Sequence, residues 1–151
     1  MQISSVAQAA STTDADTIAI GIFDGETPPP GSPPQLGELL DSGEARRSFK
    51  SLALTHAEGK RWLLVGLGAR ADFTAERARV AASVASARAT EISTRTLCWQ
   101  APGDAPQAAA GALAAAIVEG TILGDYRFER HKSAPGGEGS RGDAPPERLE
   151  R

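Results

Sequence analysis

The sequence has almost no cysteine, few aromatic residues and no excess of positive charge, and each shortage excludes a class of protein. Cys98 is the only cysteine in 151 residues, so an intrachain disulfide is impossible and a reducing compartment is the default. Lysine and arginine number 16 against 19 acidic residues, a net charge of −3 that disfavours a dedicated nucleic-acid surface. No apolar run reaches the ~18 residues of a membrane helix, and the N-terminus does not resemble a signal peptide. We therefore expect a soluble, cytoplasmic protein.

The familiar signatures of an active site are also missing. His56 and His131 are isolated and fit no zinc-binding spacing, so both are interpreted as surface residues. No G-x-S-x-G pattern offers a serine nucleophile, and Cys98 lies in an apolar strand, where we expect a buried, inert thiol. Asp14 and Asp16 could bind a cation, although such a pair is more often part of a solvated loop. The sequence thus predicts no catalytic, cofactor-binding or metal-binding residue in this chain.

What the chain does contain is an apolar run at residues 62–65 that ends in a Gly-Leu-Gly turn at 66–68. A run without polar alternation indicates a strand buried on both faces, as in the centre of a sheet that helices cover. An alanine-rich helix is predicted to begin about six residues later, with Thr74 as its N-cap. The order strand, turn, helix is typical of α/β domains.

The remaining elements follow from periodicity and turn signals. Strands are predicted at residues 1–11, 17–23, 49–56 and 95–99, and an extended exit at 125–128. Helices are predicted at 34–42, from Thr74 to about Thr90, and from a cap at Asp104 to Gly124. The turn at 57–60 predicts a hairpin, which gives the central strand an antiparallel neighbour and makes the sheet mixed. Small residues at 108–116 should let the last helix lie close to the sheet.

Residues 66–71, Gly-Leu-Gly-Ala-Arg-Ala, fit the dinucleotide-binding pattern G-x-G-x-x-G/A after a strand. Two observations oppose that interpretation. The helix begins too late for its N-terminal amides to hold a pyrophosphate, and Glu91, the candidate for the ribose, precedes the next strand. A plain strand-to-helix turn is the favoured interpretation.

Three segments together resemble the N-terminal domain of the cytosolic leucyl aminopeptidases. They are the apolar run with its Gly-Leu-Gly turn, the Phe-Thr-Ala-Glu sequence at 73–76 followed by Arg79, and residues 119–133, Glu-Gly-Thr-Ile-Leu-Gly-Asp-Tyr-Arg-Phe-Glu-Arg-His-Lys-Ser. The likeness covers about residues 15–133, with a poor match in the loop at 27–48. It assigns residues 1–132 to such a domain and leaves 133–151, rich in glycine and proline, as a flexible linker or tail.

This resemblance implies a three-layer α/β/α fold of macro-domain type with a mixed sheet. It also implies a parent aminopeptidase that removes N-terminal residues with two divalent metals, manganese or zinc. Those metals are held in a separate C-terminal domain whose Asn-Thr-Asp-Ala-Glu-Gly-Arg motif does not occur here. The chain is therefore interpreted as a fragment without cofactors of its own. Its implied partners are that catalytic domain and the other subunits of a hexamer, and its implied role is to assist assembly and active-site access.

Two alternatives remain open. Macro-type domains often bind ADP-ribose or a related nucleotide in a cleft at the ends of their strands, where the turn at 66–68 would lie. A DNA-contacting role, known for some members of the family, has local support only from Arg127, Arg130 and Lys132 around Tyr126 and Phe128. The net charge opposes contact with DNA, and this edge is better explained by packing against a neighbouring domain.

Overall fold

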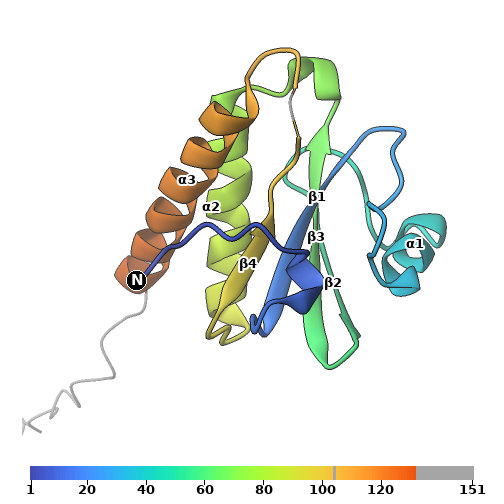
Figure 1. Cartoon of the computed structure of the whole chain (residues 1–151), viewed down its shortest axis with the longest axis horizontal. Helices are drawn as coiled ribbons and strands as arrows, with labels where there is room; N and C mark the ends of the chain where they lie inside the picture. The colour runs from blue at the N-terminus through green and yellow to red at the C-terminus, as the bar shows by residue number, and fades with distance from the viewer. Residues whose placement is uncertain (104, 132–151) are drawn as a thin grey trace, which may run out of the picture.

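The computed structural model describes residues 1–103 and 105–131, except for the side chains of 127–131 (Figure 1). Its sheet has four strands: β1 (Thr17–Phe23), β2 (Leu52–Ala57), β3 (Lys60–Gly68) and β4 (Leu97–Gln100). The order is β2-β3-β1-β4, with β1 parallel to β3 and β4, and β2 antiparallel to β3. The predicted mixed sheet is confirmed. The proposed linker at 133–151 lies outside the described residues.

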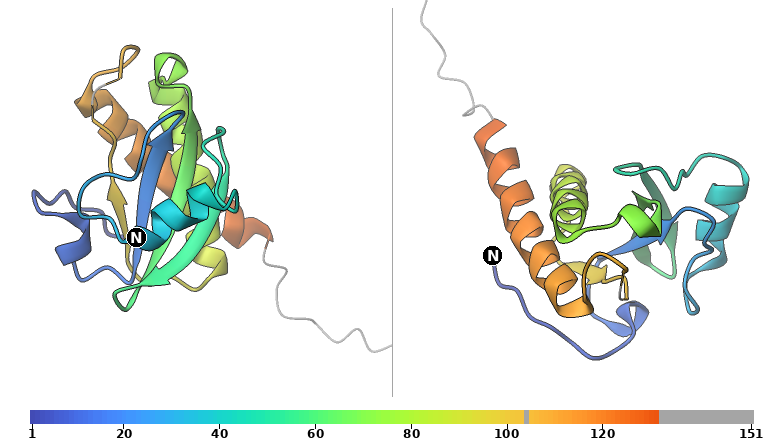
Figure 2. Two further views of the ribbon diagram at one scale, coloured as in Figure 1. Left: turned by 90° about the vertical axis from the view of Figure 1, so that its right-hand side faces the viewer. Right: turned by 90° about the horizontal axis from the view of Figure 1, so that it is seen from above.

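Helices cover both faces of the sheet, which gives the predicted three layers (Figures 1 and 2). On one face, α1 (Pro34–Asp41) packs its Leu36 and Leu40 against Trp62 and Leu64 of β3. On the other face lie α2 (Ala75–Glu91) and α3 (Ala110–His131). Because the odd and even residues of β3 enter different cores, the run at 62–65 has no polar member. β3 is therefore the buried central strand that the sequence predicts.

Two local predictions are confirmed in detail. The side-chain oxygen of Thr74 accepts a hydrogen bond from the backbone N–H of Arg77 at 3.2 Å, so Thr74 is the N-cap of α2. The hairpin between β2 and β3 turns at Glu58 and Gly59, whose φ angles of 54° and 71° are both left-handed. Such angles are typical of a tight two-residue hairpin.

The predicted strand at 1–11 is wrong. The only regular element there is a short 3₁₀ helix, η1 (Ala10–Thr12), and Ile3 and Val6 remain exposed. Neither apolar side chain enters a core, so little hydrophobic burial offsets the entropy of ordering a strand. The backbone of residues 1–8 forms no hydrogen bond with the backbone of any described residue.

The last helix begins later than predicted and ends later. Asp104, its predicted cap, lies outside the described residues, and Ala105 and Ala108 form an isolated antiparallel bridge before α3 begins at Ala110. The predicted end at Gly124 and the extended exit at 125–128 are both wrong, because α3 continues through them to His131.

The two glycines within α3 explain this error. A Cβ atom on Gly120 would lie 2.0 Å from the carbonyl oxygen of Arg79, and one on Gly124 would lie 2.4 Å from that of Ser83. Both glycines therefore let α3 approach the backbone of α2, and neither ends the helix. The close approach predicted between this helix and the sheet is made mainly with α2.

The buried face of α2 contains no large side chain. Val80 and Val84 are only half-buried. The buried members are all small: Ala78, Ala81, Ala82, Ala85, Ser86 and Ala89. Small side chains on α2 and glycines on α3 together bring the two helical backbones close. Among the described residues, no helix is long and apolar enough to cross a membrane.

Candidate functional site

The carboxyl ends of β1, β3 and β4 meet at one edge of the sheet, where open α/β sheets usually bind ligands. A crevice of about 250 Å³ lies there. Its walls are the end of β1, residues 26–29, Arg70 and residues 100–103. The crevice is smaller than the ~300–1,000 Å³ of ordinary ligand pockets.

The charged groups around this crevice already bind one another. The Nε of Arg70 donates to Oε1 of Glu26 at 2.8 Å, and the Arg70 guanidinium lies 4.2 Å from the ring centre of Phe23. The Nε of Arg47 donates to the backbone oxygen of Glu26 at 2.7 Å. Glu26 is thereby held by two arginines, one through its side chain and one through its backbone. This arrangement joins three segments of the chain, around residues 26, 47 and 70, and leaves the Glu26 carboxylate paired.

The Gly-Leu-Gly turn after β3 also has an internal partner. A Cβ atom on Gly66 would lie 2.1 Å from the backbone oxygen of Ser48, and the N–H of Gly68 donates to the oxygen of Arg47 at 2.8 Å. The backbone of residues 46–50 therefore packs directly against this turn. A 3₁₀ helix, η2 (Arg70–Asp72), then separates it from α2. These contacts support the plain turn over a dinucleotide-binding loop, and no observation favours a nucleotide in the crevice.

The isolated candidate residues are not brought together. His56 is exposed on β2, and Glu91 ends α2, where it accepts a hydrogen bond from Arg88 at 2.9 Å. Cys98 is half-buried rather than buried as predicted. In the part of the chain that the structure describes, no group of three or more histidine, cysteine, aspartate or glutamate side chains could hold a metal ion.

The basic cluster proposed around Tyr126 can be placed only in part. The backbones of Arg127, Phe128 and Arg130 belong to the last turns of α3, but their side chains are not described. The side chain of His131 is likewise not described, and Lys132 lies outside the described residues.

Of the two predicted aspartates, Asp16 has a clear structural role. Its carboxylate accepts hydrogen bonds from the backbone N–H groups of Arg95 at 3.1 Å and Thr96 at 3.3 Å, and thereby joins the start of β1 to the start of β4. Burial disfavours the charged carboxylate, but these bonds and those from the side chains of Arg95 and Thr17 outweigh burial and hold the pKa of Asp16 below its usual value. Asp16 thus links the starts of β1 and β4 through its hydrogen-bonded carboxylate.

Because the pKa of Asp16 is lowered in the folded protein, we expect this carboxylate to make a pH-dependent contribution to stability. A carboxylate with a lowered folded-state pKa stabilises the protein above its unfolded-state pKa, and the contribution is lost as the pH falls through the folded-state value. We expect Asp16→Asn to lower the free energy of unfolding by about 1 kcal/mol at pH 7. In urea titrations the gap from wild type should stay constant down to about pH 5 and shrink below about pH 4. A gap that widened in acid would contradict this assignment.

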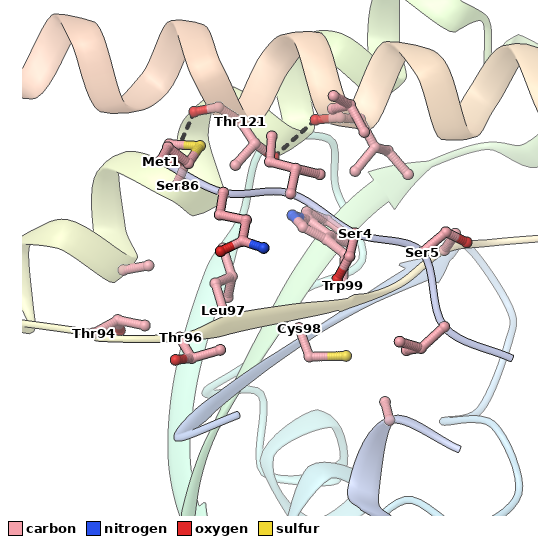
Figure 3. A pocket seen from close by; sticks show the side chains of 18 of the residues that line it. Met1, Ser4, Ser5, Ser86, Thr94, Thr96, Leu97, Cys98, Trp99 and Thr121 are labelled. Atoms are coloured by element: carbon pink, nitrogen blue, oxygen red, sulfur yellow. Dashed lines mark hydrogen bonds between the residues drawn. The ribbon is translucent and has the colours of Figure 1, made fainter. Parts of the chain in front are cut away.

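A larger groove of about 880 Å³ lies beside β4, beneath the N-terminal segment (Figure 3). Leu97 and Trp99 point from the strand toward the helices, and Cys98 points to the opposite face (Figure 3). The hydroxyls on the helical side already donate to backbone oxygens: Ser86 to Thr121 at 3.0 Å and Thr121 to Ile117 at 2.8 Å. These two hydroxyls are therefore already used as hydrogen-bond donors within the helical layer.

One surface escaped prediction from the sequence: the outer face of α3. Val118, Ile122, Leu123 and Tyr126 remain 37% to 63% exposed there. The spacing of four between 118, 122 and 126 was the available signal, because it places three large apolar residues on one side of a helix. The buried residues Leu113 and Ile117 lie on the opposite side.

Comparison with known proteins identifies relatives over most of the chain. Residues 36–135 match the profile of the cytosol aminopeptidase family, N-terminal domain. A "probable cytosol aminopeptidase" of Roseiflexus castenholzii is 32% identical over 126 residues, which are 81% of this chain and 25% of that protein. A protein of the same description from Microcystis aeruginosa is 30% identical over 144 residues, 88% of this chain and 29% of that protein. The chain thus spans little more than a quarter of these relatives.

Two solved structures are similar as well. The bottromycin maturation enzyme BotP in complex with Mn is 28% identical with a TM-score of 0.61, over 79% of this chain and 25% of that one. A mutant of tomato leucine aminopeptidase, 22% identical with a TM-score of 0.60, covers 85% of this chain and 29% of its own, and its likeness shows the fold alone.

Proposed function

This chain belongs to the cytosol aminopeptidase family as an N-terminal domain, and from that membership we propose that it is the non-catalytic accessory domain of a metal-dependent aminopeptidase. The observation that carries the proposal is the match of residues 36–135 to the family's N-terminal domain. The match covers only 25% and 29% of the two relatives, which leaves room in them for a separate catalytic domain.

We place the chemistry of the parent enzyme, removal of N-terminal residues from peptides, in that other domain. The Mn in the BotP complex supports a metal-dependent reaction for this family, with two manganese or zinc ions expected in the parent. The described side chains of this chain do not fit such ions, since they include no cluster of metal-binding groups. No reaction step is therefore assigned to residues 1–126.

The role we propose for this domain is to assist assembly of the enzyme and to shape access to its active sites. Its partners would be the catalytic domain of the same protein and further subunits, as in a hexamer. The helical layer supports this role, because the close packing of α2 and α3 gives a rigid body suited to holding other domains in place.

A peptidase assay tests the proposal directly. We expect the purified 151-residue chain, supplied with manganese, to release no chromophore from leucine p-nitroanilide above the buffer rate. The full-length Roseiflexus relative, assayed alongside, serves as the positive control. Turnover by the 151-residue chain that persisted through repurification would place the catalytic site here and overturn the proposal.

A further inference from the structure

Between Ala110 and Tyr126, where the side chains of α3 are described, the fully exposed positions carry little charge, and Asp125 is half-buried. The exposed residues between the start of α3 and Tyr126 are small or apolar with a single exception, Glu119. They are Ala110, Gly111, Ala112, Ala114, Ala115, Val118, Ile122, Leu123 and Tyr126. The carboxylate of Glu119 is itself paired with the guanidinium of Arg79 on α2, with Nη2 and Oε2 2.7 Å apart.

The other two helices differ clearly from α3. The exposed positions of α1 include Glu38 and Asp41, and those of α2 include Glu76 and Glu91. Helices that face water normally carry charged residues on their outer side. A helix face with large apolar residues and one neutralised charge marks a surface that another protein surface covers.

The position of α3 and its close packing against α2 are suited to a docking surface. α3 lies at the outer end of the helical layer, beyond α2 (Figure 2), and Val118 also lines the groove beside β4. Gly120 and Gly124 fix the opposite face against the backbone of α2. The apolar side chains are therefore presented on a rigid support, which reduces the entropy lost when a partner binds.

We propose that this face, formed by Val118, Ile122, Leu123 and Tyr126, docks onto an apolar surface of the catalytic domain of the same polypeptide. The inference rests on the proposed function. The occupant follows from chain order: α3 is the last described element, and the relatives continue for about three quarters of their length outside the match to their N-terminal domain. In such a longer protein the catalytic domain would be covalently joined to this one, so its effective concentration at this face would be high.

Cysteine labelling measures whether the face is covered. Ile122→Cys and, as a matched control, His56→Cys are made in a Cys98→Ser background. His56 is exposed on β2, at the opposite edge of the sheet from β4. Each variant is studied in the 151-residue chain and in a chimera in which this chain replaces the matched quarter of the Roseiflexus relative. Maleimide labelling is followed at each site by mass spectrometry, alongside size-exclusion chromatography and leucine p-nitroanilide turnover.

We expect Ile122→Cys to label about tenfold more slowly in the chimera than in the 151-residue chain, and His56→Cys to label equally in both. Equal labelling of Ile122→Cys in an active chimera would overturn the docking proposal and leave the proposed function intact. Slow labelling already in the 151-residue chain, together with a dimer on the column, would overturn it too and assign the face to a second copy. An inactive chimera whose isolated domain is folded would count against the proposed function itself.

Discussion

Replacing Gly120 with alanine is expected to lower the free energy of unfolding by about 3 kcal/mol. The added Cβ atom would lie 2.0 Å from the carbonyl oxygen of Arg79, 2.8 Å from its carbonyl carbon and 2.9 Å from the Cβ of Ala82. Two of these atoms are backbone, so no side chain can rotate away to relieve the overlap. α3 must move away from α2, and the packing of Leu113 and Ile117 against α2 and the sheet would be weakened.

The sign of this effect separates tertiary packing from local helix preference. In an isolated helix, alanine is favoured over glycine by about 1 kcal/mol. Gly111 lies in the same helix, and a Cβ atom added there would meet nothing within 4 Å, so Gly111→Ala should raise the free energy of unfolding by up to about 1 kcal/mol. Chemical denaturation of both variants measures the pair. A stabilising Gly120→Ala would show that α3 does not approach α2 this closely.

Gly120 and Gly124 also show where sequence reasoning reaches its limit. From local sequence alone, a glycine that ends a helix cannot be distinguished from a glycine that lets a second helix pack closely against it. What distinguishes them is the partner backbone, about 40 residues earlier in the chain, which local sequence does not specify. The predicted end of the helix at Gly124 was wrong for this reason, and the continuous apolar face of α3 was hidden by the same error.

The strands were more predictable because their signal is local. The range 17–23 predicted for β1 agrees with Thr17–Phe23, since a β-branched run ends at an Asp-Gly turn. The N-cap at Thr74 and the hairpin at Glu58 and Gly59 depend on residues within four positions of each other. Family resemblance, carried by three separated segments, supplied what periodicity could not: the identity of the domain.

The turn at Gly66 gave two interpretations from one pattern, and a substitution there separates them. If the missing side chain of Gly66 served only to admit a bound pyrophosphate, Gly66→Ala would leave the stability of the free protein nearly unchanged. The structure predicts the opposite. The added Cβ atom would lie 2.1 Å from the oxygen of Ser48 and 2.9 Å from that of Arg46, both backbone atoms of a chain segment that crosses the turn.

We expect Gly66→Ala to lower the free energy of unfolding by about 3 kcal/mol without any ligand present. The loss should exceed the steric cost alone, because two ladder-like bonds flank the contact: Gly66 N–H to the oxygen of Ser51 at 2.8 Å, and Lys50 N–H to the oxygen of Gly66 at 3.0 Å. Gly37→Ala on α1, where a Cβ would meet nothing within 4 Å, is the matched control and should not destabilise. If thermal unfolding of Gly66→Ala matched wild type, the crossing segment would not press on this turn. The room above Gly66 would then be available to a ligand, and the nucleotide interpretation would regain its physical basis.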